Sequence, residues 1–176
     1  MKKLYLSVSD LKNAKENLKV GDRVFLSGTV YTARDAAHKR IFELIDDGKA
    51  LPFPIIDSVI YYAGPTPTPN GKAIGSCGPT TSARMDPYTP SLYEKGLLAT
   101  VGKGERNQAV IDAIKKHKTV YFCALGGAGA LASACITSAE VIAFQDLGCE
   151  SVKRLTFHDF PLTVAIDTNG DSIFEH

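Results

Sequence analysis

The stretch VFLSGTVY, Val24–Tyr31, followed at once by TARD, Thr32–Asp35, decides the fold class of this sequence. Its first part is rich in β-branched and aromatic residues, a composition typical of a strand. The second part opens a helix with Thr32 as a plausible N-cap, and apolar residues then recur roughly at helical spacing until Gly48. A strand that leads directly into a helix predicts an arrangement that combines both kinds of element.

The same alternation continues through most of the chain. We expect a helix from Ser9 or Asp10, another over residues 107–118, and shorter ones after Ser82, at Ser91 and over residues 131–135. The predicted strands are residues 24–31, 59–63, 73–76, 97–101, 120–125, 140–144, 152–157 and 162–167. This pattern favours a mixed α/β or α+β layered domain, with residues 1–176 forming a single domain.

The composition is that of an ordinary globular protein. Of 176 residues, 44% are hydrophobic and 22% are charged. The net charge of +1 gives no broad attraction to nucleic acid or anionic lipid, so neither partner is expected. The apolar stretch near Met1 is too short for a signal peptide, and no run is long enough to span a bilayer. The expected location is therefore the cytoplasm.

The four cysteines do not suggest a metal centre. Cys77, Cys123, Cys135 and Cys149 match no C-x-x-C zinc or thioredoxin pattern, and we interpret them as reduced and mostly buried. Cys77 lies in a glycine-rich loop, which leaves its role open. An iron–sulfur site usually needs three or four thiolates, and the sequence offers no convincing set, so no metal ligand is expected from this chain.

A first candidate loop carries Arg34 at the expected start of a helix. Helix starts favour acids, so an arginine there needs a reason. One interpretation is an anionic ligand held jointly by the guanidinium and the helix N-terminus. The alternative is a surface ion pair with Asp35 or another acid. His38, in the same segment, fits a structural or solvent-exposed histidine as well as a functional one.

A second candidate loop is Gly75–Met85, which places glycines, hydroxyl side chains and Arg84 around a helix start. Its amides and hydroxyls could hold a carboxylate, with Arg84 as a fork. The alternative is an ordinary N-cap with a surface arginine. The third loop, Gly102-Lys103-Gly104, allows close backbone approach and supplies a point charge, but it is not a Walker A sequence. Segment 126–129 likewise lacks the dinucleotide-binding spacing.

Together the three loops supply three cations, Arg34, Arg84 and Lys103, a number that would match two carboxylates on a small substrate. The sequence shows no Ser–His–Asp or Cys–His pairing and no H-E-x-x-H motif. Adding or removing water next to a carboxylate needs a Lewis acid or another polarising group. Such a group would have to come from elsewhere.

Several of these motifs resemble the beta region of class I fumarases. The most distinctive is Gly78-Pro79-Thr80-Thr81-Ser82-Ala83-Arg84-Met85, and the similarity covers nearly the whole chain in the right order. The other matching segments are Gly21-Asp22 with Gly28, Ala33–His38, Gly102–Gly104, Gly126–Ala128, Ala143–Gly148 and Asp159–Pro161. The sequence is identified as a member of the class I fumarate hydratase and L-tartrate dehydratase beta-subunit family.

The resemblance implies a fold, a cofactor and a partner. The fold is a swivelling β/β/α domain. Catalysis would depend on a four-iron, four-sulfur (4Fe-4S) cluster whose cysteine ligands lie in an alpha region that this sequence lacks. A separate alpha subunit would therefore hold the cluster, and a dimer of alpha–beta pairs is expected by analogy.

The resemblance also implies roles for individual residues. Arg34, Arg84 and Lys103 would bind substrate carboxylates, with Thr81 beside them. Thr80 would lie beside the reacting carbons and is the candidate for proton transfer, although a threonine hydroxyl is a poor base unless something activates it. Two further site residues, Asp35 and His38, would orient Arg34 or line the pocket.

The implied reaction is the reversible hydration of fumarate to malate, with this chain inactive alone. L-tartrate dehydration to oxaloacetate is the close alternative, because both activities use similar motifs. An alternative enzyme is a cofactor-free lyase that uses Lys103 or Thr80. An alternative of another class is a non-catalytic small-molecule-binding domain, against which the retention of three cations and Thr80 argues.

Overall fold

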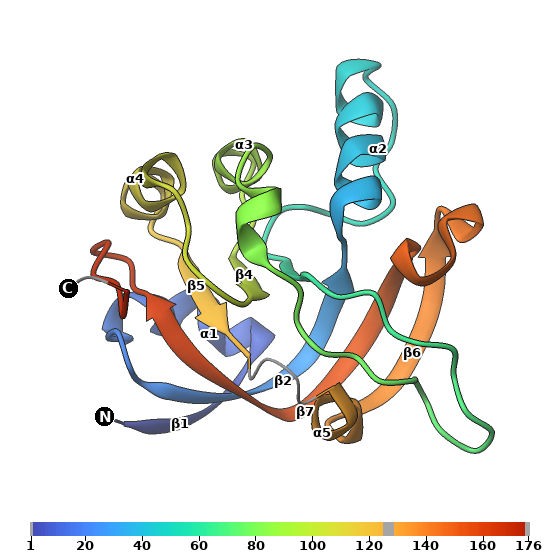
Figure 1. Cartoon of the computed structure of the whole chain (residues 1–176). Coiled ribbons are helices and arrows are strands. Elements are labelled where there is room, and N and C mark those ends of the chain that lie inside the picture. Colours follow the sequence, from blue (N-terminus) through green and yellow to red (C-terminus); the bar gives the residue numbers. More distant parts are fainter. Residues whose placement is uncertain (1, 125–128, 175–176) are drawn as a thin grey trace.

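The computed structural model describes residues 2–124 and 129–174, which form a mixture of strands and helices (Figure 1). The strands are β1 Lys3–Ser7, β2 Arg23–Thr32, β3 Val59–Tyr61, β4 Ala99–Gly102, β5 Val120–Cys123, β6 Ile136–Ala143 and β7 Val152–Ile166. The α-helices are α1 Val8–Ala14, α2 Asp35–Asp46, α3 Thr89–Glu94, α4 Gln108–His117 and α5 Gly129–Ala134. The 3₁₀ helices are η1 Lys15–Asn17, η2 Ser82–Met85 and η3 Gln145–Glu150. The predicted mixed α/β class is therefore confirmed.

The strands pair into a sheet that closes on itself. Neighbours β2, β3, β4 and β5 are parallel, and the long strand β7 pairs antiparallel with both β5 and β2. Strand β1 extends the sheet beside β2, and β6 extends it beside β7. Because β2, β3 and β4 are adjacent and parallel, their carboxyl ends meet at one edge, the usual place for ligand binding in α/β proteins.

The parallel strands are buried on both faces. Helices α2, α3 and α4 lie along one side of them (Figure 1). Side chains alternate along each strand, so Ile60 and Tyr121 pack beneath these helices, whereas Val59, Tyr61 and Phe122 face the layer formed by β2 and β7. Two hydrophobic clusters therefore separate three layers, one of helices and two of strands.

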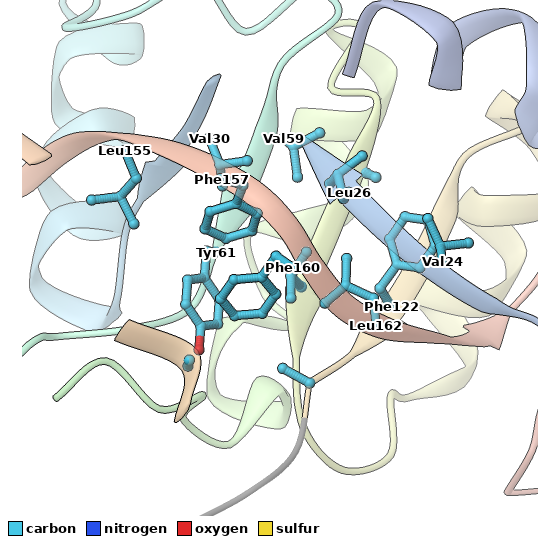
Figure 2. Close-up of a cluster of buried hydrophobic side chains, with 14 of the residues drawn as sticks. Val24, Leu26, Val30, Val59, Tyr61, Phe122, Leu155, Phe157, Phe160 and Leu162 are labelled. Carbon is cyan, nitrogen blue, oxygen red and sulfur yellow. The ribbon is translucent and has the colours of Figure 1, made fainter. Parts of the chain in front are cut away.

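An aromatic group fills the cluster between the two strand layers (Figure 2). The rings of Phe157 and Phe160 stack with centroids 4.1 Å apart, and Tyr61 meets both edge-on at 5.8 and 5.5 Å. The Tyr61 hydroxyl donates a hydrogen bond to the Cys77 carbonyl at 2.6 Å. The core thus holds in place the long segment that follows β3.

The C-terminal part of the sheet differs from the sequence prediction. The two strands predicted at residues 152–157 and 162–167 are one strand, β7. The backbone of Asp159 takes a positive φ of 47°, and the register to β2 shifts between Leu26 and Gly28. A β-bulge between Phe157 and Phe160 therefore accommodates one extra residue in β7. The strand continues beyond it, with Pro161 in register opposite Phe25.

The N-terminal elements and one loop also differ. The sequence analysis did not predict β1, and Ser7 rather than Ser9 or Asp10 caps α1: its hydroxyl accepts from the Asp10 amide at 3.0 Å. The predicted strand at residues 73–76 is absent from the described residues. Ser76 bonds instead across its own loop to Thr66, through its amide at 2.8 Å and its carbonyl at 2.9 Å.

Part of the glycine-rich segment, residues 126–128, lies outside the described residues. Helix α5, predicted at residues 131–135, begins at Gly129 and ends at Ala134. In the described part of the chain, no helix has both the length and the apolar character that crossing a membrane requires.

Candidate functional site

Three loops that the sequence singled out meet where β2, β3 and β4 end. Backbone bonds join them: the Ala33 amide donates to the Tyr61 carbonyl at 3.1 Å, and the Tyr62 amide donates to the Val101 carbonyl at 2.8 Å. The Thr80 amide donates to the Tyr62 carbonyl at 2.8 Å. The loops of Arg34, Thr80 and Lys103 therefore lie side by side, although they are widely separated in the sequence.

Arg34 occupies the N-cap position of α2, with extended backbone and no side-chain cap. Thr32, which the sequence suggested as the cap, is fully buried, and its hydroxyl accepts from the Lys153 amide at 3.1 Å. The Arg34 side chain instead lies against Gly64, where an added Cβ would be 3.0 Å from both Cδ and Nη1 of the arginine. The absence of a side chain at Gly64 therefore leaves space for the Arg34 side chain.

The acid nearest to Arg34 is Glu150, not Asp35. Arg34 Nε lies 3.9 Å from Glu150 Oε1, with about a quarter of the arginine side chain exposed. Asp35 instead pairs with Arg84, whose Nε lies 3.3 Å from Asp35 Oδ2, and both side chains are nearly half exposed. Arg84 thus pairs with the residue that directly follows Arg34, at the start of α2.

Thr80 and Thr81 follow the long loop after β3. The Thr80 hydroxyl donates to the Tyr62 carbonyl at 3.0 Å, and its side chain is half-buried. A hydroxyl that donates to a carbonyl keeps its lone pairs free to accept from another donor. Thr81 is exposed, and its backbone forms a parallel bridge to Lys103, which brings the second and third loops together.

Lys103 is positioned by close backbone packing. Its amide donates to Ser82 Oγ at 3.1 Å, and its carbonyl accepts from the Ser82 amide at 3.0 Å. A Cβ at Gly102 would fall 2.0 Å from Ser82 Oγ, so a glycine is required there. Lys103 is half-buried, and it forms no ion pair within the described ranges, 2–124 and 129–174.

His38 lies one helical turn after Arg34 but faces the protein interior. Its side chain is fully buried between Tyr62 and Tyr88, with ring centroids 5.7 and 5.4 Å away. Nδ1 lies 2.9 Å from the Arg34 carbonyl and must donate to it, because a carbonyl can only accept. Burial lowers the pKa of His38 to about 4, so the ring is neutral near pH 7.

The cysteines are free thiols. Cys77 packs in the core, where burial raises its pKa to about 12, so a structural role accounts for it. Cys123 and Cys135 are partly buried, whereas Cys149 is exposed, against the expectation of burial. Within the residues that the structure describes, no three His, Cys, Asp or Glu side chains gather as metal ligands.

Comparison with known proteins identifies the family of this chain. The family model described as "Fumarase C-terminus" matches residues 1–176. The chain belongs to this family. The resemblance to class I fumarate hydratases and tartrate dehydratase beta subunits drawn from its motifs is therefore confirmed.

Relatives occur in two lengths. The chain is 42% identical to "Fumarate hydratase class I, aerobic" of Escherichia coli (strain K12), over 89% of this chain and 29% of the relative. It is 44% identical to "Fumarate hydratase 2" of Leishmania major, over 88% and 28%. It is 38% identical to "Putative L(+)-tartrate dehydratase subunit beta" of Methanocaldococcus jannaschii, over 93% and 87%. The chain thus spans less than a third of these fumarate hydratases.

Two features of this Fumarase C-terminus domain escaped the sequence analysis. Glu150 lies 116 residues after Arg34 in the chain (150 − 34), and no local pattern links them. Arg106 is fully buried and bonds to Asp86, whereas the sequence pointed only to the nearby Lys103. The available signal was a charged residue directly before Asn107, the N-cap of the helix that begins at Gln108, but the sequence does not show that its side chain is buried.

We predict that His38 makes the stability of the domain fall in acid. The unfolded histidine takes up a proton near pH 6.5, but the buried ring does so only near pH 4. The domain therefore has its full stability with respect to His38 above pH 6.5. As the pH falls toward 4, the free energy of unfolding decreases, by roughly 3 kcal/mol in total.

Urea unfolding of wild type and His38→Phe at several pH values measures this effect. The stability of the wild type relative to the variant should drop between pH 6.5 and 4. The matched control is the same replacement at His158, whose side chain is 72% exposed, measured at the same pH values. Parallel curves for wild type and His38→Phe would contradict the interpretation.

Proposed function

We propose that this chain is the beta subunit of a hydro-lyase that reversibly hydrates fumarate to malate. The observation that carries the proposal is the meeting of the loops that bear Arg34, Thr80, Arg84 and Lys103 at the carboxyl ends of three parallel strands. Homologues named as fumarate hydratases share about two fifths of the residues over most of the chain. The three-layered fold is compatible with the swivelling β/β/α domain that the resemblance implies.

The substrate would be held through its two carboxylates. Arg34 and Arg84 offer forked donors, which suit carboxylates, and Lys103 offers a compact positive charge. The Arg84–Asp35 pair is substantially exposed, so exchange of Asp35 for a substrate carboxylate costs little. In the free site Asp35 would hold Arg84 until the substrate replaces it, and buried His38 would orient Arg34 through the Arg34 carbonyl rather than touch the substrate.

Thr80 would act at the reacting carbons. Its loop adjoins the loops of Arg34 and Lys103, and a hydroxyl there would suit proton transfer or the positioning of the group that performs it. Because its hydroxyl already donates to the Tyr62 carbonyl, an oxygen lone pair is oriented away from that bond. Thr81, exposed beside Lys103, would contact the same substrate.

The Lewis acid would come from a partner. The described residues gather no group of three His, Cys, Asp or Glu side chains that could hold a metal ion. We propose that a separate alpha subunit binds a 4Fe-4S cluster, which would supply the polarising group for the hydroxyl that leaves or adds. A relative named as a beta subunit, of which the chain covers 87%, supports a two-chain enzyme. A dimer of alpha–beta pairs in the cytoplasm completes the proposal.

A second candidate function is L-tartrate dehydration. The same relative favours it, because it matches this chain at nearly full length and is named as a tartrate dehydratase subunit. A non-catalytic small-molecule-binding domain is less well supported, because the three cations and Thr80 are all present at one edge of the sheet. Substrate tests separate these possibilities.

We predict that the chain is inactive alone. Hydration of fumarate should be measured anaerobically with this chain alone, and then with a cluster-loaded alpha subunit encoded beside it. Activity in the mixture alone is the expected result. Activity of the isolated chain would contradict the proposal, and turnover of tartrate but not fumarate would establish the second candidate function.

We predict that Arg84→Ala lowers kcat/KM of the assembled enzyme by about 10²-fold or more, because a lost charge contact to the bound carboxylate costs roughly 3 kcal/mol. Stability should change by less than about 1 kcal/mol, since the Asp35 pair is exposed. The matched control is Arg154→Ala, which breaks the exposed pair with Glu140 on β6. Equal activities of the two variants would contradict the carboxylate-binding role.

A further inference from the structure

A buried arginine links the loops that carry Arg84 and Lys103. The side chain of Arg106 has no exposed surface, and its Nε donates to Asp86 Oδ1 at 2.6 Å. Arg106 follows Lys103 by three positions, and Asp86 follows Arg84 by two. The ion pair therefore joins the two site loops close to their functional side chains.

The guanidinium is fixed in several directions at once. Its Nη1 donates to Thr100 Oγ1 at 3.3 Å, and its Nη2 donates to Thr89 Oγ1 at 2.7 Å and to the Tyr62 hydroxyl at 3.2 Å. Its carbon lies over the rings of Tyr62 and Tyr121, 5.2 and 4.8 Å from their centroids. An ammonium group cannot reproduce this planar fork of donors.

Asp86 is held as firmly as its partner. Its second oxygen, Oδ2, accepts from the Asn107 amide at 2.9 Å, at the start of α4. The carboxylate thus bonds to two consecutive residues of the third loop. Because both charges are buried, separating them would leave each charge without a partner, which is strongly destabilising. Movement of either loop would therefore be opposed by the ion pair.

A second link lies closer to Lys103. Ser82 Oγ accepts from the Lys103 amide and lies 2.8 Å from the Tyr121 hydroxyl, which is also 2.8 Å from the Gly104 carbonyl. The carbonyl can only accept, so Tyr121 donates to it and accepts from Ser82. Tyr121 therefore bridges the loop of Arg84 to the loop of Lys103.

We propose that Arg106 is a positioning residue that sets the separation between Arg84 and Lys103, and thereby the carboxylate spacing that the site accepts. Arg106 itself touches no substrate. This inference rests on the proposed function, since it takes both cations as carboxylate ligands. Packing alone does not require the buried Arg106–Asp86 pair, because apolar side chains could fill the same space. A positioning role explains why charged residues are found there.

The test compares competitive inhibitors of different length in the assembled enzyme. Inhibition constants for malonate, succinate and glutarate are measured for wild type and Arg106→Lys. Wild type should favour one length, and the variant should reduce that preference by about tenfold or more, since a misplacement of about 1 Å can cost about 10²-fold in rate. A merely structural role would lower the active fraction and leave the ratios unchanged.

A second variant keeps the test decisive if Arg106→Lys does not fold. Tyr121→Phe removes only the hydroxyl between Ser82 and Gly104, and it should reduce the length preference in the same direction by a smaller factor. The control is Tyr5→Phe, the same change in an exposed ring of β1 that stacks on Phe25, outside the site loops. The ratios of the inhibition constants for the three dicarboxylates should equal those of wild type.

The outcomes distinguish two failures. If the assembled wild type shows no hydro-lyase activity and binds none of the dicarboxylates, the proposed function fails. If wild type is active and discriminates by length, but Tyr121→Phe and every folded Arg106→Lys preparation keep its ratios, only the positioning role is overturned.

Discussion

The structure depends on the burial of three short parallel strands, β3, β4 and β5, on both of their faces. Each has only three or four residues, so backbone pairing alone would hold it weakly. Helices on one side and the β2–β7 layer on the other exclude water from both faces (Figure 1). This enclosure fixes the register of the strands, and the register in turn sets where the loops at their carboxyl ends meet.

The three arginines at this edge differ in their exposure, and the difference matches what each can do. Arg106 has no exposed side-chain surface and pairs with Asp86, Arg34 is about a quarter exposed near Glu150, and Arg84 is about half exposed beside Asp35. A buried pair resists separation, whereas an exposed pair contributes little and exchanges partners readily. The buried arginine is thus suited to positioning, and the more exposed ones to binding.

Sequence patterns predicted the class of the fold and most of its elements, because alternating strands and helices leave a periodic signal. They did not predict the continuous strand β7, in which one bulge at Asp159 carries the strand past Pro161. They indicated Arg34, Arg84 and Lys103 as loop cations, and the structure brings their loops together. The pairing of Arg34 with Glu150 and the burial of Arg106 depend on long-range contacts, which no local pattern contains.

The central claim is that Arg34, Arg84 and Lys103 together hold a dicarboxylate. Its most direct test is a crystal structure of the assembled enzyme with a bound dicarboxylate inhibitor. The account predicts that both carboxylates lie within hydrogen-bonding distance of these three side chains, with Thr80 beside the central carbons. A ligand bound elsewhere, with Arg84 still paired to Asp35 and Lys103 facing solvent, would contradict it.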